Sequence, residues 1–355
     1  MRLRMIAFLA LLMAGSAAAA DPLRDQAKGL FEPIPETPPS LPGEPATPEK
    51  LALGKMLYFD PRLSENHDIS CSSCHNISMG GGGSPSIGHS QQLGGRKVLT
   101  VLNAVFNKMQ FWDGRASDLK EQVVSSVMAN PKALLTSRGG PMMTSPAEMN
   151  IVRQHAVEEL KGIPGYVDAF KKAFPAEADP IQYDNVGKAI ALFESTLITP
   201  DSPFDRWLKG DDEALSQEQK EGLKIFADKG CANCHNGINI GGGMYARFGT
   251  VKDPPSELLP PDDWGRFTIT KQISDKYVFK VPALRNVELT APYFHSGRVW
   301  DLKRAVAVMA EAQLGQKLSE DEISKVAEFL KSLTGRQPEV VLPILPPSVA
   351  ATPRP

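Results

Sequence analysis

The stretch Cys71-Ser-Ser-Cys74-His75 recurs further along the chain as Cys231-Ala-Asn-Cys234-His235. Both copies follow the pattern C-x-x-C-H, the attachment signature of a c-type haem, in which two thiols add to the haem vinyl groups and the histidine binds the iron. The two copies use every cysteine of the chain, so no thiol remains for a disulfide. The sequence therefore predicts two covalently bound haem c groups, attached through Cys71, Cys74, Cys231 and Cys234, with His75 and His235 as iron ligands.

Two other kinds of site also use closely spaced cysteines. A zinc ion held by two C-x-x-C pairs would require the pairs to converge, and it would give no reason for a histidine after each pair. A thioredoxin-like redox pair normally lies in a βαβ pattern, and the sequence shows no such pattern. The repeated histidine favours haem.

The first 20 residues have the pattern of a secretory signal peptide. A charged start, Met1-Arg-Leu-Arg-Met, precedes a short apolar run from Ile6 to Met13 and small residues up to Ala20. A membrane anchor would need about 20 apolar residues, so we expect cleavage after Ala20 and no membrane span. The formal net charge of -2 does not indicate a nucleic-acid partner. We expect an exported protein, in the periplasm of a bacterium.

Helix signals predict a mainly α fold with two domains and one haem in each. Thr47-Pro48, Ser216–Gln219 and Ser319–Glu322 are typical helix starts. A helix followed by C-x-x-C-H occurs twice, and we expect the helix after Ser319 to pack on the one after Ser216. The predicted order is a signal peptide at 1–20, an extended proline-rich lead-in at 21–46, haem domains at 47–205 and 206–336, and a disordered proline-rich tail at 337–355.

Each haem iron needs a second ligand, or an open position, on its far side. His89 follows the glycine run 80–83, and such a loop changes conformation at low steric cost. This histidine could bind one iron in one state and leave it in another, or it could be an ordinary surface residue. Met309 lies in an apolar segment near the last predicted helix. It could ligate the second iron and raise its potential, or it could simply fill space in the core.

With the two haem motifs in order, the chain resembles the bacterial dihaem cytochrome c peroxidases, which are related to the MauG-type dihaem enzymes. The matching stretches are Leu53–Leu63, Ser86–His89, Gln110–Arg115, Pro292–Gly297 and Gln313–Gly315. The resemblance extends over nearly all of the mature sequence, and these stretches are its most specific parts.

The resemblance implies two cytochrome c-like haem domains with a shared interface. The N-terminal haem would be the low-potential peroxidatic one, with His75 on one side of the iron and the displaceable His89 on the other. The C-terminal haem would accept electrons at high potential, with His235 and Met309 as its ligands. Trp112 matches the tryptophan between the haems. The related quinone-forming enzymes have a tyrosine where Met309 stands, so the match favours a peroxidase.

The family also has an acidic residue over the peroxide site and a calcium ion between the domains. The acid falls on Glu148 if residues 132–144 are an insertion, although a glutamate in a first helical turn is common for other reasons. Thr290 and Pro292 match positions that offer carbonyls to calcium, but the asparagine ligand falls on Lys97. An ammonium group cannot coordinate a cation, so we expect calcium to be weakly bound or absent.

The function implied by the resemblance is reduction of hydrogen peroxide to water. The electrons would come from a small cytochrome c or cupredoxin, and family members are often homodimers. Two alternatives remain: a MauG-like oxidase of an organic or protein substrate, and a dihaem cytochrome that only transfers electrons.

Overall fold

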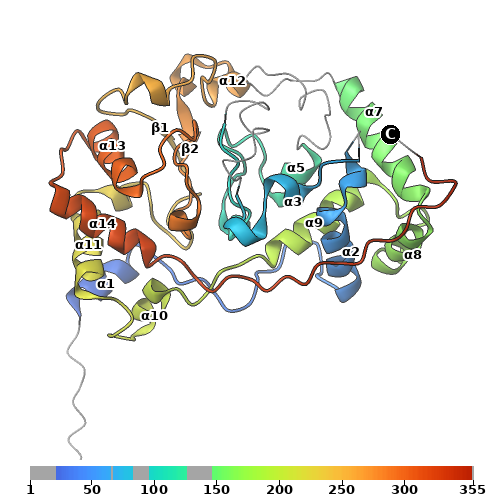
Figure 1. Ribbon diagram of the computed structural model, residues 1–355, viewed down its shortest axis with the longest axis horizontal. Coiled ribbons are helices and arrows are strands. Elements are labelled where there is room, and N and C mark those ends of the chain that lie inside the picture. Colours follow the sequence, from blue (N-terminus) through green and yellow to red (C-terminus); the bar gives the residue numbers. More distant parts are fainter. Residues whose placement is uncertain (1–20, 65–66, 83–95, 126–145, 354–355) are drawn as a thin grey trace, which may run out of the picture.

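The computed structural model describes residues 21–64, 67–82, 96–125 and 146–353. Two helical bodies lie side by side (Figure 1). The first contains α2 (Pro48–Phe59), α3 (Cys71–Cys74), α5 (Leu119–Val124), α7 (Pro146–Lys161), α8 (Pro164–Ala173) and α9 (Tyr183–Ser195). The second contains α1 (Pro22–Lys28), α10 (Pro203–Lys209), α11 (Gln217–Asp228), α12 (Phe267–Thr270), α13 (Leu302–Leu314), α14 (Glu320–Lys331) and the antiparallel strands β1 (Tyr245–Arg247) and β2 (Val278–Lys280). The predicted mainly α fold is confirmed.

The three predicted helix starts are confirmed. The Thr47 hydroxyl accepts a hydrogen bond from the Lys50 backbone N–H at 3.3 Å and begins α2. Ser216 and Ser319 form capping boxes at the starts of α11 and α14. These side chains satisfy backbone donors that have no partner inside the helix.

Each body is built around a pair of closely crossing helices. In the first body, a Cβ placed on Gly54 of α2 would lie 1.8 Å from the Ala189 carbonyl oxygen of α9. In the second, a Cβ on Gly222 of α11 would lie 1.9 Å from the Lys325 carbonyl oxygen of α14. Glycine therefore lets the two backbones approach in both bodies. The packing of α14 on α11 confirms the predicted pairing of these helices.

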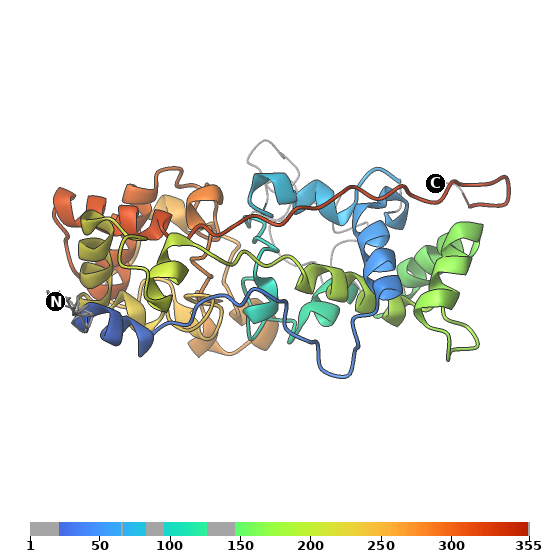
Figure 2. The same ribbon diagram turned by 90° about the horizontal axis from the view of Figure 1, so that it is seen from below.

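The prediction of an extended lead-in at 21–46 is wrong in part. The segment begins with helix α1 and packs on the second body. Phe31 is buried in the second core beside Phe204. The Arg24 guanidinium lies over the Trp207 ring, and the Leu30 carbonyl accepts from the Gly237 N–H at 2.8 Å. The chain then crosses to α2 (Figure 2). The burial of Phe31 and these contacts hold the segment in place on the second body.

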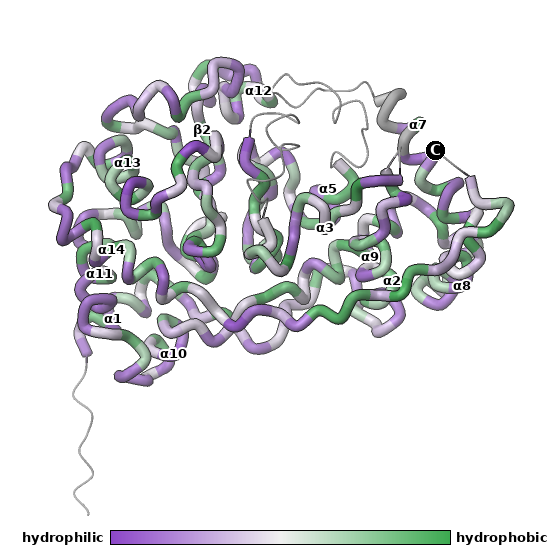
Figure 3. Tube along the Cα trace, viewed as in Figure 1, coloured by the Kyte–Doolittle hydropathy of each residue, from purple (hydrophilic) through white to green (hydrophobic). Residues whose placement is uncertain are grey.

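The tail, predicted to be disordered, is instead an extended strap (residues 336–353) that runs from the second body along the first (Figure 2). Its part near the first body is hydrophobic (Figure 3), and Val340 packs on the first core. The Arg62 guanidinium donates to the Ser348 hydroxyl and the Pro346 carbonyl, each at 2.9 Å. The Thr352 hydroxyl donates to the Gly162 carbonyl at 2.8 Å. Partners distant in sequence, rather than local propensity, fix this segment.

Within the described ranges, no helix is long and apolar enough to cross a bilayer.

Candidate haem sites

The second body encloses a cavity whose wall contains Cys231, Cys234, His235 and Met309. The cysteines lie in and just after the 3₁₀ turn η5 (Cys231–Asn233), which follows α11. Gly230 makes this connection in the left-handed region, with φ +95, where residues other than glycine are strained. Met309 comes from α13. The fold thus brings the predicted attachment residues and both predicted iron ligands of the second haem to one cavity.

The two motif histidines are oriented in the same way. His75 Nδ1 lies 3.0 Å from the Leu99 carbonyl oxygen, and His235 Nδ1 lies 3.4 Å from the Ile240 carbonyl oxygen. A carbonyl oxygen only accepts, so Nδ1 carries the proton and Nε2 keeps its lone pair for a metal. Burial lowers the pKa of His75, and it lowers the pKa of His235 to about 4. Both rings are therefore neutral, as an iron ligand must be.

The first haem motif begins α3, and its surroundings are only partly described. The Tyr58 hydroxyl of α2 donates to the His75 carbonyl oxygen at 2.6 Å, which ties the end of the motif to the core. Glu148 is the third residue of α7. His89 and the 132–144 insertion lie outside the described residues.

The cavity of the second body has a mainly apolar wall that includes two lysines, Lys97 and Lys280. Burial lowers the pKa of Lys97 to about 7 and that of Lys280 to about 8, because low-dielectric surroundings disfavour an ammonium ion. Buried charges need partners of opposite sign, and a haem carries two propionates. An apolar wall with two cationic groups therefore fits a haem. No sequence motif singles out Lys280.

Trp112 lies in the wall of the same cavity and connects it to the first site. Its Nε1 donates to the Lys97 carbonyl oxygen at 2.8 Å. Two residues later, the Leu99 carbonyl accepts from His75. The Lys97 N–H also donates to the His295 carbonyl at 2.7 Å. A three-residue segment thus links His75 of the first body to the tryptophan beside the second cavity.

His295 is a buried wall residue for which the sequence suggested no role. Its ring stacks on Phe279 at 4.2 Å between centroids, and burial lowers its pKa to about 4. Of the other histidines, His67 faces Glu159 at 3.7 Å, and His155 lies on α7. The position of a histidine in the sequence does not show whether its ring is buried, solvated or bound to a metal.

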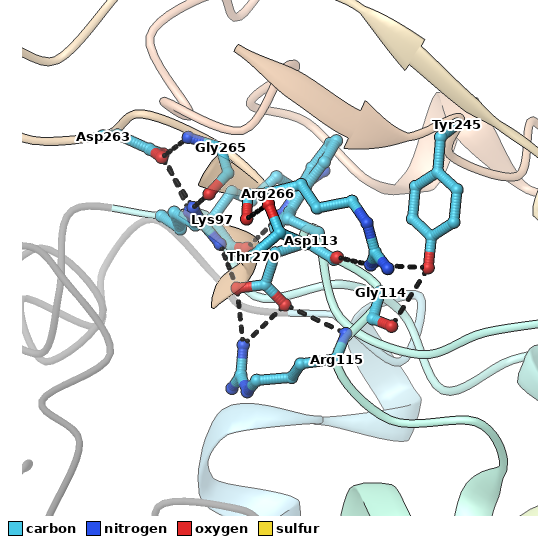
Figure 4. A network of polar contacts seen from close by, with 11 residues as sticks. Lys97, Asp113, Gly114, Arg115, Tyr245, Asp263, Gly265, Arg266 and Thr270 are labelled. Atoms are coloured by element: carbon cyan, nitrogen blue, oxygen red, sulfur yellow. Dashed lines mark hydrogen bonds and ion pairs between the residues drawn. The ribbon is translucent and has the colours of Figure 1, made fainter. Parts of the chain in front are cut away.

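A network of charged groups around Asp113 joins the two bodies (Figure 4), and Asp113 directly follows Trp112 in the sequence. Arg96 donates to Asp113 at 2.8 Å and to Asp263 at 2.6 Å. Arg266 of the second body donates to the Asp113 carbonyl oxygen at 2.8 Å. Arg115 also pairs with Asp113, at 3.1 Å. Since Asp113 and Asp263 are almost fully buried, these contacts fix the position of Trp112 against the second body.

Lys97 contacts Thr290, and both residues fall on positions that match calcium ligands of the family. The Lys97 ammonium donates directly to the Thr290 carbonyl oxygen. This carbonyl therefore already accepts a hydrogen bond from a lysine side chain. Pro292 follows two residues later, and the Tyr293 ring lies 5.8 Å from the Lys97 Nζ.

The zinc and redox alternatives fit this structure poorly. Among the described residues, no three His, Cys, Asp or Glu side chains are placed to hold a metal ion by themselves. Burial raises the pKa of Cys71, and it raises that of Cys231 to about 11. A redox-active pair needs a lowered thiol pKa, so neither motif has the electrostatics of a thioredoxin-like site.

Comparisons with known proteins agree with this arrangement. Residues 48–214 match the family described as di-haem cytochrome c peroxidase, and residues 219–334 match cytochrome c. The chain is 52% identical over 340 residues to the cytochrome c551 peroxidase of Pseudomonas aeruginosa, covering 95% of this chain and 94% of that protein. The chain belongs to the dihaem cytochrome c peroxidase family.

A second family member, the cytochrome c551 peroxidase of Nitrosomonas europaea, is 46% identical, covering 89% of this chain and 90% of that protein. Among solved structures, a MauG-like protein associated with microbial copper homeostasis aligns with a TM-score of 0.69 at 23% identity, covering 85% of this chain and 95% of that one. This last likeness concerns the fold alone. Haem c is the cofactor of this family.

Proposed function

We propose that this protein reduces hydrogen peroxide to water, with electrons from a small c-type cytochrome or cupredoxin in the periplasm. The observation that carries the proposal is the 52% identity to a cytochrome c551 peroxidase over 95% of the chain. The presence of Met309 and His235 in one cavity wall supports it further. A thioether and an imidazole on one iron give a closed, high-potential site suited to electron transfer.

Two haem c groups would be held by this chain, one in each body. Cys71, Cys74 and His75 would hold the first, and the second would be held by Cys231, Cys234, His235 and Met309. When bound, the haems supply the electrons that cleave the O–O bond of peroxide. Lys97 and Lys280 would offer cations to the propionates of the second haem, which fits their position in an otherwise apolar wall.

The remaining roles fall to residues of the first body. Glu148 would take a proton from the near oxygen of peroxide and return it to the far one, which is general base and then general acid catalysis. His89 would leave the first iron to open the peroxide site. Trp112 would lie on the electron path, which its hydrogen bond to the segment leading to His75 supports.

We further propose that the mature protein starts near Asp21 and that the haem domains span 47–205 and 206–336. A homodimer is part of the proposal because family members often form one. For calcium, we propose that the contact of Lys97 with the Thr290 carbonyl takes the place of a tightly bound ion.

A steady-state peroxide assay with a reduced small cytochrome c tests the proposal. Glu148→Gln should keep both haem spectra and lose about 10²–10⁴-fold in turnover, the usual contribution of a positioned acid–base group. Glu158→Gln, an exposed glutamate on the same helix, is the matched control and should turn over like wild type. Absence of wild-type turnover would favour a cytochrome that only transfers electrons. Slow turnover with small donors, together with oxidation of an organic or protein substrate, would favour an oxidase.

A further inference from the structure

Glu194 of α9 is a buried carboxyl that the proposed peroxidase mechanism does not use. Its side chain is 2% exposed. Among the residues that the structure describes, its Oε2 atom has no hydrogen-bond partner. Burial raises the pKa of Glu194 to about 8, because an apolar environment disfavours the carboxylate. A buried carboxyl oxygen without a partner is costly, which points to a role other than packing.

The neighbours of Glu194 belong to the first haem motif. The carboxyl is close enough to Tyr58 and to Cys71 for its negative charge to raise the pKa of both. Cys71 is the first residue of α3 and one of the predicted attachment points. The Tyr58 hydroxyl donates to the His75 carbonyl oxygen at 2.6 Å. Glu194 therefore lies beside the helix that would carry the first haem.

The other charged groups on and around α9 are paired with one another at the opposite end of the helix. Asp184, in its first turn, pairs with Lys120 of α5 at 2.8 Å and with Lys188 at 3.1 Å. Lys188 also reaches Glu44 at 3.4 Å, and Glu44 pairs with Lys50 of α2 at 3.0 Å. Arg153 of α7 lies over the Tyr183 ring and donates to the Val124 carbonyl of α5. None of these cations pairs with Glu194, whose raised pKa has burial as its cause.

We propose that Glu194 takes up one proton from solvent for each electron added at the first haem. The proposal rests on the proposed function, because it needs a haem on Cys71, Cys74 and His75. A ferric c-haem carries one net positive charge at its centre, which favours a nearby carboxylate. The added electron removes that charge, and the carboxylate in its apolar surroundings then binds a proton. The electron comes from the external donor, and an O–H bond on Glu194 is the only bond formed.

The midpoint potential of the first haem should therefore depend on pH. One proton per electron lowers the midpoint potential by about 59 mV per pH unit, since a tenfold change corresponds to 59 mV for one electron. A structural carboxyl that stayed neutral would give no slope. Glu194 is a positioning residue in this account, because it acts on the haem potential and not on peroxide.

Redox titration of the two-haem protein, followed by visible spectra between pH 5 and 9, tests the proposal. Below about pH 8, the value to which burial raises the pKa of Glu194, the low-potential haem of the wild type should show a slope approaching 59 mV per pH unit, and Glu194→Gln should flatten it. The matched control is Glu159→Gln, which changes another buried carboxyl of the first body and should keep the wild-type slope. A slope retained in Glu194→Gln, or absent from the wild type, would overturn the inference.

A second measurement serves if the variant does not fold. Electrochemical reduction of the wild type in weakly buffered solution, with a pH indicator, should show one proton taken up with the electron that reduces the low-potential haem. No uptake would overturn the inference while leaving a peroxide-active protein with two haems. A wild-type protein that lacks the first haem, or that has both haems and no peroxide turnover, would instead overturn the proposed function and this inference with it.

Discussion

The ion pair between Arg285 and Asp205 gives the sharpest stability prediction, because an exposed pair of equal length serves as its control. Arg285 Nη1 lies 2.7 Å from Asp205, and the two side chains are 1% and 0% exposed. Arg285 also donates to the Ile238 carbonyl at 3.1 Å and to the Glu32 carbonyl at 2.9 Å. It thus ties the loop after His235 to α10 and to the lead-in.

Replacing Arg285 by methionine keeps an unbranched aliphatic stem but removes the guanidinium, which leaves the Asp205 carboxylate buried without its cation. Such a change costs about 3–5 kcal/mol of unfolding free energy. Arg336 and Glu36 are also 2.7 Å apart, but their side chains are 61% and 53% exposed. Water and ions screen that pair, so Arg336→Met should cost about 0–1 kcal/mol.

Denaturant titrations followed by far-UV circular dichroism and by the Soret band would measure both variants. The Soret transition should shift with Arg285→Met because the affected loop follows the second haem motif. Equal, small losses in the two variants would refute the reasoning that burial decides the strength of this pair.

Three further predictions concern the sites. Met309→His should lower the potential of one haem, because imidazole stabilises the oxidised iron relative to a thioether. Potentiometry would show no change in either haem if Met309 is not a ligand. The control is Met244→His, at an exposed methionine. Chelation of calcium should leave turnover unchanged, since the Lys97 ammonium already contacts the Thr290 carbonyl; loss of activity that added calcium restores would contradict this. Burial in the folded protein raises the pKa of Glu194 to about 8, against 4.5 for an ordinary glutamate. The folded chain then holds a proton that the unfolded chain has lost, so the unfolding free energy should fall as pH rises from about 4.5 to 8, and Glu194→Gln should remove this slope.

The sequence was most informative where structure is decided locally. A capping hydroxyl acts within three residues, so the starts of α2, α11 and α14 could be predicted from Thr47, Ser216 and Ser319. The haem motifs are equally local. The placement of Met309 near His235 was predictable only through the family resemblance, because the loop between them brings together residues far apart in the chain.

Features decided by tertiary contacts were missed. The proline content of the strap suggests disorder, and nothing near it in sequence reveals that Arg62 binds its backbone. Lys280 reads as an ordinary surface residue, although it is 2% exposed. Glu194 did leave a signal, since it directly follows the apolar run Ala189–Phe193. A charged residue on the buried side of a helix is a reason to look for a function.

The central claim of this account is that the two haem sites are unequal, and the spectrum of the half-reduced protein tests it most directly. Addition of one electron per protein should give one low-spin, six-coordinate haem with methionine ligation and one high-spin, five-coordinate haem in the first body. Only the latter can admit peroxide. Two six-coordinate, low-spin haems in every redox state would contradict the account and leave a protein that carries electrons without reducing peroxide.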